Sequence, residues 1–516
     1  MVEDGCRNVP SSTFIFSDYL MRNKLAIVSL CIALLPLHSS AQNGADKFQE
    51  KFDKFKKQKQ GKYDNFRNEV NRKYADFIRQ SWAKLKPEPP VVKPKEEDVP
   101  PVIVPPQDTI SATPIIDTPL PPIINVIEPP VIESQPIPVA PIQEIPMPVT
   151  EDAISTDCWG TTFNVRFSNN QKFKLNGYSN EDVAYAWEKM SEESYNNTIR
   201  DCLLARAEHQ LNDWAYLNFL HNLSQTIYGN SNEAVLLTAY LYCQSGYKIR
   251  FARNGSNLRM LFSSQHCIYG KSCFVIDGFN FYVFGEDITG ELEFCPGTYP
   301  NEKPLSLLIP KQPVLDISES AKRTLVSSAY PEISINVSVN ENIVKLCSEY
   351  PSSFIDNDFM TRWAMYANTP LADDVKEQLY PQLNQIISGQ TQLEAVNRLL
   401  NWIQTGFVYE YDDKVWGDDR PFFAEETLYY PYCDCEDRAI LLSRLVRDLL
   451  NLDAILVYYP GHLAMAVGFT EEVKGDHITV DNKRFIVCDP TYINAPAGKT
   501  MPDMDNSTAK IALLSK

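Results

Sequence analysis

Three residues in the C-terminal part of the chain have the types and the order of a nucleophile, a base and an orienting acid. Cys435 stands in PYCDCEDRAILLSRLVRDLL, His462 in DAILVYYPGHLAMAV and Asp489 in KRFIVCDPTY. A thiolate can attack a carbonyl carbon after an imidazole takes the thiol proton, and a carboxylate on the other ring nitrogen fixes the tautomer. These segments predict nucleophilic catalysis by Cys435, with His462 as base and Asp489 as orienting group.

The thiol is predicted to open a helix. Apolar side chains recur at helical spacing after Cys435, and the positive end of a helix favours a thiolate. Asp434, Glu436 and Asp437 oppose this effect with negative charge. An imidazolium at His462 would offset these acids by forming an ion pair with the thiolate.

The base and the acid are predicted to lie on strands. Residues 453–467 read as two strands joined at Pro460 and Gly461, with His462 at the start of the second. Asp489 ends a third strand. His477 is the rival base, but its GDHITV setting reads as a turn entering a strand, with no carboxylate at a matching place. We therefore assign the base to His462.

At this point the sequence resembles a known family. The stretch PFFAEETLYYPYCDCEDRAILLSRLVRDLL is similar to the transglutaminase-like superfamily, in particular the bacterial exported transglutaminase-like cysteine peptidases, through its acid-Thr-Leu, Asp-Cys-Glu-Asp and Leu-rich helix. The resemblance covers about residues 390–500. It implies a papain-like α+β fold with Cys435, His462 and Asp489 as the triad. Where the family usually has Gly before the Asp-Cys pair, this chain has Cys433, which leaves the local turn and a redox partnership with Cys435 open.

The resemblance also suggests a cation site and a group of aromatic residues that could contact substrate. In some of those peptidases the acids beside the cysteine bind calcium, so Asp434 and Glu436 are candidate ligands. An oxygen-rich calcium site needs more donors than these, and the triad chemistry itself requires no cofactor. Trp416, Tyr430 and Tyr432 are candidates for an oxyanion donor or substrate platform, with core packing as the alternative for each.

The N-terminal part reads as a leader, an arm and a spacer. Residues 1–41 are predicted to be an upstream extension and a signal peptide, because MRNK at Met21 is followed by LAIVSLCIALLPL and a small-residue cleavage site. The mature protein would be exported, periplasmic or secreted, without a transmembrane span. Residues 42–86 predict a basic amphipathic helical arm, broken at Gly61, and residues 87–150 a Pro-rich linker.

The charge of these segments suggests their partners. Residues 44–86 hold 13 basic and 6 acidic side chains, so their net charge is +7 within a chain of net charge −18. The arm is predicted to be a solvated helix or short coiled coil, with docking on an anionic cell-envelope surface as the alternative. The linker favours polyproline II and would hold arm and globular part apart. The acidic total argues against nucleic acid as a partner.

Two globular blocks follow, at residues 151–320 and 321–516. NEAVLLTAYLYCQSGYKIRF in the first matches DRAILLSRLVRDLLNLDAIL in the second without a gap. The match places Asn230 at the position of Cys435 and Asn257 at that of His462, with Gly285 near the place of Asp489. The first block is then a degenerate transglutaminase-like domain without the chemistry. Chance similarity would leave it an accessory domain.

Together these observations predict an exported cysteine hydrolase of the peptidase or amidase type. It would act on a protein or peptide substrate through an acyl-thioester, with water as acceptor. A protein-crosslinking transglutaminase, with an amine as acceptor, is one alternative. A non-catalytic envelope-associated binding protein that keeps the fold is the other.

Overall fold

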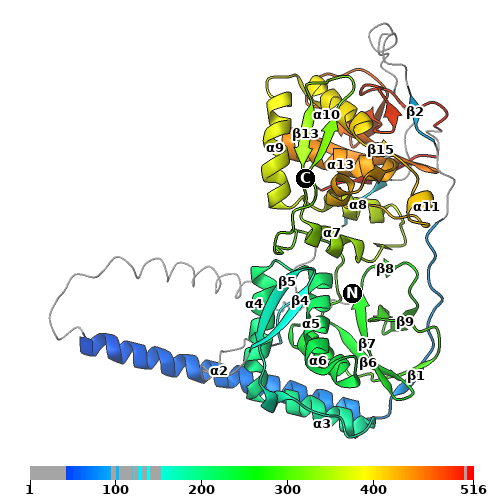
Figure 1. Cartoon of the computed structure of the whole chain (residues 1–516). Coiled ribbons are helices and arrows are strands. Elements are labelled where there is room, and N and C mark those ends of the chain that lie inside the picture. Colours follow the sequence, from blue (N-terminus) through cyan, green and yellow to red (C-terminus); the bar gives the residue numbers. More distant parts are fainter. Residues whose placement is uncertain are drawn as a thin grey trace, which may run out of the picture. The chain divides into compact units, whose positions relative to one another are not determined.

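The computed structural model describes residues 42–94, 100–103, 119, 126–130, 136–139, 153–504 and 508–515 (Figure 1). These residues form a mixture of helices and sheets, as the predicted α+β class requires. The chain divides into two compact units, Met1–Lys62 and Tyr63–Lys516. The predicted signal peptide lies outside the described residues. Within the described part, no helix is both long and apolar enough to cross a membrane.

Helix α2 (Gln42–Arg79) crosses the boundary between the two units. The predicted break at Gly61 is wrong, because Gly61 lies inside this helix. One interior glycine costs a helix about 1 kcal/mol relative to alanine. That cost is small for a helix of 38 residues whose C-terminal end is anchored by packing.

The last turns of α2 belong to the core of the second unit. Tyr74 is buried, and its ring centroid lies 4.8 Å from those of Trp187 and Tyr299. Arg67 is also buried and donates to Asn196 Oδ1 at 2.5 Å. The solvated helix predicted for the arm is therefore wrong over these turns, because Tyr74 and Arg67 pack on the first block.

The first block contains four α-helices, a hairpin and a six-stranded sheet in the order β1-β11-β6-β7-β10-β9. The helices are α3 (Asn180–Met190), α4 (Asn196–Glu208), α5 (Asp213–Tyr228) and α6 (Asn232–Gln244), with 3₁₀ turns η2 (Asn169–Gln171) and η3 (Glu193–Tyr195). The hairpin is β4 (Ala153–Cys158) and β5 (Thr161–Arg166). The sheet strands are β1 (Ala83–Leu85), β6 (Ile249–Asn254), β7 (Asn257–Ser264), β9 (Cys273–Ile276), β10 (Phe279–Val283) and β11 (Leu292–Phe294).

The second block has its own six-stranded sheet, in the order β19-β20-β18-β17-β22-β3. Its strands are β3 (Val126–Ile127), β17 (Asp453–Tyr459), β18 (His462–Gly468), β19 (His477–Val480), β20 (Lys483–Cys488) and β22 (Lys510–Leu513). The helices are α7 (Glu341–Ser348), α8 (Thr361–Asn368), α9 (Asp373–Ile387), α10 (Gln392–Gly406), α11 (Asp412–Val415), α12 (Ala424–Tyr429) and α13 (Cys435–Leu450). Helix α13 packs on β17 and β18, whose side chains are almost all buried.

Short strand pairs complete the second unit. A hairpin is formed by β12 (Arg323–Val326) and β13 (Ser334–Val337), and β15 (Val408–Tyr409) runs parallel to β16 (Tyr432–Cys433). The two blocks are joined by pairing of β8 (Cys267–Ile268) with β14 (Ser353–Phe354). This pairing brings the β8–β9 loop of the first block to the second.

The Pro-rich segment does not hold the arm apart from the blocks at its described points. Glu88 pairs with Cys273, β2 (Val102–Ile103) runs parallel to β21 (Tyr492–Ile493), and β3 runs parallel to β22. Proline removes only its own N–H, so the other residues of an extended segment can still bond to a sheet edge. The predicted separating spacer is therefore wrong over these stretches.

The two sheets share a strand order. In chain order, α6 is followed by β6, β7, β9 and β10, which lie as β6-β7-β10-β9; α13 is followed by β17, β18, β19 and β20, which lie as β17-β18-β20-β19. All these neighbours are antiparallel, as are β11 on β6 and β22 on β17. One helix and five strands are therefore arranged alike, as a repeated unit predicts.

The shared arrangement corrects one residue of the ungapped match. Asn257 begins β7 as His462 begins β18, in agreement with the match. The first residue of α6 is Asn232, however, while Asn230 precedes the helix. Asn232 therefore stands where Cys435 opens α13, because α6 starts two residues later than the match assumes.

Candidate active site

Cys435 is the first residue of α13, as the sequence predicts, and Asp434 is the N-cap. Asp437 accepts hydrogen bonds from the main-chain N–H groups of Asp434, at 3.2 Å, and Phe422, at 2.8 Å. These bonds fix the start of the helix against the preceding loop. The Cys435 side chain is 8% exposed and lines a cavity of about 500 Å³.

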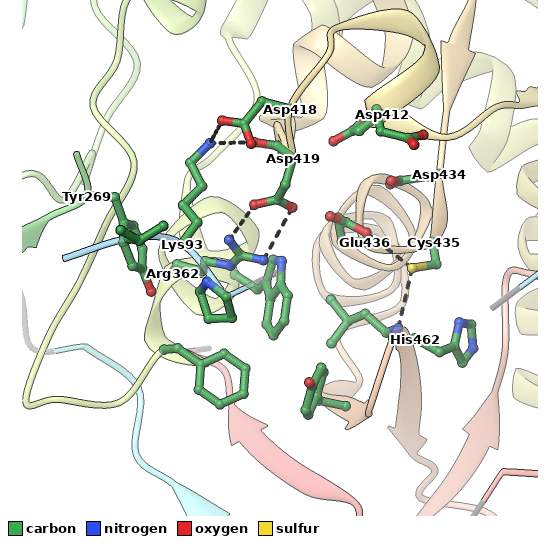
Figure 2. A pocket seen from close by; sticks show the side chains of 18 of the residues that line it. Lys93, Tyr269, Arg362, Asp412, Asp418, Asp419, Asp434, Cys435, Glu436 and His462 are labelled. Carbon is green, nitrogen blue, oxygen red and sulfur yellow. Dashed lines mark hydrogen bonds and ion pairs between the residues drawn. The ribbon is translucent and has the colours of Figure 1, made fainter. Parts of the chain in front are cut away.

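The immediate partners of the thiol favour its protonated form. Cys435 Sγ donates to Glu436 Oε2 at 3.1 Å and accepts from the Leu463 N–H at 3.5 Å (Figure 2). Burial raises the pKa of Cys435 well above its usual value, and the charges of Glu436 and Asp434 raise it further. The helix dipole alone does not outweigh these effects, so a thiolate needs a base or a cation beside it.

His462 is held in place by Asp489. His462 Nε2 lies 2.9 Å from Asp489 Oδ2, and both side chains are buried. The other carboxylate oxygen accepts from the N–H groups of Thr491, at 2.8 Å, and Tyr492, at 3.2 Å. His462 Nδ1 is buried and has no hydrogen-bond partner within the described part of the chain. The ring therefore keeps one nitrogen available for a proton.

The structure brings Cys435 and His462 to one cavity wall. Both residues line the cavity, and the thiol contacts Leu463, the residue that follows His462. Gly461 makes this approach by closing the β17–β18 turn with φ of +76°, a conformation that suits glycine. Asp489 stands behind the imidazole and does not line the cavity.

The rival residues lie elsewhere. His477 is on the edge strand β19, where its Nδ1 lies 3.1 Å from Gly475 O and 3.2 Å from Arg484 Nη2, and it does not line the cavity. Cys433 donates to Val408 O at 3.8 Å, and both it and Cys435 are free thiols. Neither His477 nor Cys433 lines the cavity that holds Cys435.

Two buried side chains that the sequence did not single out hold the Asp489 loop. Gln404 Nε2 donates to the carbonyls of Asp489, at 3.0 Å, and Tyr492, at 2.8 Å. Arg438 Nη1 donates to Pro490 O at 3.3 Å and to Gln404 O at 3.2 Å. They act through Asp489 as positioning residues. The available signal in the sequence was an arginine four residues before Leu442, on the face where the apolar side chains of the helix recur.

An acidic cluster lies beside the thiol. The described residues hold three sets of side chains whose ligand atoms lie within 4.8 Å of one another: Asp434, Cys435 and Glu436; Asp412, Asp434 and Asp437; and Asp412, Asp419 and Glu436. Burial and mutual repulsion raise the pKa values of Asp434, Glu436 and Asp437. Asp434 is 5% exposed, and its Oδ1 has no hydrogen-bond partner among described atoms.

The cluster supplies the donors that the sequence alone did not. To the predicted Asp434 and Glu436 it adds Asp412, Asp419 and Asp437. The cluster combines several carboxylates, and Asp434 Oδ1 has no described partner, which fits a hard cation such as calcium that prefers oxygen ligands. The signal in the sequence was the acidic run from YDDK to WGDDR, just before the cysteine.

The three predicted platform aromatics do not line the cavity. Trp416 packs on Tyr430 with ring centroids 4.8 Å apart, and Tyr430 accepts from Arg420 Nη2 at 3.2 Å. Tyr432 is 41% exposed on β16. The aromatic wall of the cavity consists instead of Tyr269, Phe359, Trp363 and Tyr458. Trp363 and Tyr458 contact each other and Phe359, which makes one continuous apolar side.

Comparisons with protein families, with curated proteins and with solved structures found no match to this chain.

Proposed function

We propose that the second block is a cysteine hydrolase of the transglutaminase-like type, with a papain-like arrangement of Cys435, His462 and Asp489. The state of His462 carries the proposal. Its Nε2 is held by Asp489, its buried Nδ1 has no described partner, and His462 lines the cavity that holds Cys435. A buried nitrogen without a partner is costly in a protein that does not use it.

These groups support acyl transfer in two halves. His462 Nδ1 takes the proton of Cys435 Sγ, and the thiolate adds to an amide carbonyl carbon. The C–N bond breaks as the imidazolium returns the proton to the leaving amine, which leaves a thioester on Cys435. His462 then deprotonates a water that adds to the thioester, and the acid leaves as the thiol is restored. Asp489 stabilises the imidazolium in both halves.

Calcium is part of the proposal as a bound cation. Asp412, Asp419, Asp434 and Glu436 would hold it through carboxylate oxygens. Bound there, the cation supplies positive charge beside the thiol. Without it, the charges of Glu436 and Asp434 raise the pKa of Cys435.

Labelling of the thiol tests the proposal. We expect a peptide electrophile to modify the full chain at Cys435, located by mass spectrometry, and Cys435→Ala to remove both this adduct and any hydrolysis. Cys433→Ala is the matched control, because Cys433 lies two residues away but outside the cavity. Absence of an adduct on Cys435 in the wild type would contradict the proposal and favour a non-catalytic binding protein.

The acyl acceptor is tested separately. The acidic side chains at the cavity, such as Asp413 and Asp418, would attract a protonated amine. Incorporation of a primary amine into a glutaminyl peptide would therefore identify the enzyme as a transglutaminase, whereas release of the free acid identifies water as acceptor. Export through the predicted signal peptide remains part of the proposal.

A further inference from the structure

A short Pro-rich segment of the chain lines part of the cavity. We call residues Glu88–Pro94 the strap; its sequence is EPPVVKP. Glu88 forms an isolated antiparallel bridge with Cys273, with N–H to O distances of 2.6 and 3.3 Å. Further along, Gly270 N donates to Val91 O at 2.9 Å. The strap is thus bound through its main chain along the β8–β9 loop, as an extended peptide is bound at a sheet edge.

Lys93 links the strap to the second block. Lys93 Nζ donates to Asp418 Oδ2 at 3.1 Å and to the main-chain oxygen of Asp419 at 2.5 Å (Figure 2). The Asp419 carboxylate is itself paired with Arg362, at 2.6 Å. The ammonium group of Lys93 is therefore bound by the Asp418 carboxylate and the Asp419 carbonyl, which we call the Lys93 site.

The Lys93 site is part of the cavity that holds Cys435. Lys93 and its two neighbours line that cavity together with Cys435 and His462. Six acidic side chains line the same space against two basic ones, Lys93 and Arg362; the acids are Asp412, Asp413, Asp418, Asp419, Asp434 and Glu436. If Lys93 moved away, the described lining of the cavity would be mainly acidic. Its other described lysine or arginine, Arg362, is already paired with Asp419.

The strap has the properties of a built-in peptide ligand. Its prolines favour an extended backbone and reduce the entropy lost on binding. Its one cationic side chain, Lys93, binds in the acidic Lys93 site. Its described hydrogen bonds with the blocks lie at Glu88, Val91 and Lys93. Such a segment can leave without disturbing a core.

We propose that the strap occupies the subsite in which an extended peptide substrate with a basic side chain binds, and that it lifts when such a peptide enters. The inference rests on the proposed function for the chemistry at Cys435. It adds the class of substrate and assigns Asp418, the Asp419 carbonyl and the Gly270 N–H to its recognition.

Hydrogen exchange tests strap displacement without catalysis. The Gly270 and Cys273 amides donate to the strap, so their exchange is followed in the full chain carrying Cys435→Ala. We expect Lys93→Ala to accelerate the exchange of both amides by roughly two- to fivefold, because the change removes one partly exposed ion pair. Lys84→Ala is the control, because Lys84 pairs with Glu291 and does not line the cavity.

Labelling rates test access to the thiol. We expect Lys93→Ala to raise the rate of Cys435 modification by a lysine-containing peptide electrophile by a similar factor, and an otherwise identical glutamate-containing electrophile to gain less. Asp418→Asn should reduce this preference for the basic probe. Iodoacetamide, small and neutral, should react with Cys435 at nearly the same rate in the wild type and in Lys93→Ala.

The outcomes separate the two proposals. If exchange at Gly270 and Cys273 and the rate for the basic probe were both unchanged in Lys93→Ala, the proposed role of the strap would be overturned. Faster exchange in Lys93→Ala with no modification of Cys435 by any reagent would support the strap and contradict the hydrolase. Equal gains for basic and acidic probes would overturn the assigned substrate class.

Discussion

The side chain of Asn232 accepts a hydrogen bond from the main-chain N–H of Leu258, with an N to Oδ1 distance of 2.9 Å. Cys435 has the same relationship to Leu463, at 3.5 Å. In each block the acceptor is the first residue of a helix and the donor is the second residue of the following hairpin's second strand. The position of the proposed nucleophile in the second block is therefore a structural polar contact in the first.

This relationship predicts that Asn232 serves stability and not chemistry. Its amide also donates to Ser256 O at 2.9 Å, so Asn232→Ala removes two bonds. We expect a loss of about 0.5–1.5 kcal/mol in the free energy of unfolding, measured by urea denaturation, with unchanged labelling of Cys435. Asn230→Ala is the matched control, because Asn230 is exposed and precedes the helix. Equal effects of the two changes would restore the ungapped match.

The second prediction concerns the base. His462→Ala should lower the rate of Cys435 labelling on the order of 100-fold, because general-base assistance is lost. Asp489→Asn should also lower the rate, but less completely than loss of the base, since an amide can still contact the ring without stabilising its charge. His477→Ala, outside the cavity, should leave the rate unchanged. A loss on changing His477 and none on changing His462 would reverse the assignment.

Calcium binding gives the third prediction. We expect millimolar calcium to raise the melting temperature of the full chain and a chelator to reverse the shift, because a ligand that binds only the folded state stabilises it. Asp434→Asn and Asp412→Asn should each abolish the shift. Asp413→Asn should not, because Asp413 lines the cavity but is absent from the acidic cluster. Equal calcium shifts in all four proteins would place the cation elsewhere.

The fourth prediction is a pH dependence of stability. Burial raises the pKa of Glu425 from 4.5 to about 7, although the carboxylate accepts from the N–H of Ala372, at 2.5 Å, and from Gln312, at 3.2 Å. Since the folded pKa exceeds the unfolded one, this carboxyl favours the fold at low pH. The contribution is lost as the pH rises through about 7.

Glu425→Gln should therefore raise the free energy of unfolding by about 1–3 kcal/mol at pH 8. Most of that gain should disappear at pH 5, where the wild-type carboxyl is protonated in the folded state. Denaturant titrations at both pH values measure it, with the exposed Glu377→Gln as control. A gain that is equal at the two pH values would mean that the cause is packing and not ionisation.

The sequence by itself determined the local framework of the site. Helix α13 begins at Cys435 because an N-cap aspartate and an apolar repeat at helical spacing are local signals. The Pro-Gly turn places His462 at the start of β18 for the same kind of reason. The ungapped match gave the strand position of Asn257 correctly. It missed Asn232, because the start of a helix depends on the cap that precedes it.

Only the tertiary structure decided which distant residues meet at the thiol. Asp412 and Asp419 join Asp434 and Glu436 because α11 and the loop that follows it lie beside the start of α13, which spacing along the sequence does not encode. Lys93 reaches Asp418 from a segment more than three hundred residues away, |i−j| = 325, that composition alone assigned to a spacer. Proline content fixes an extended backbone; whether that backbone stays in solvent or lines a cavity depends on the surface that offers it hydrogen bonds and charge.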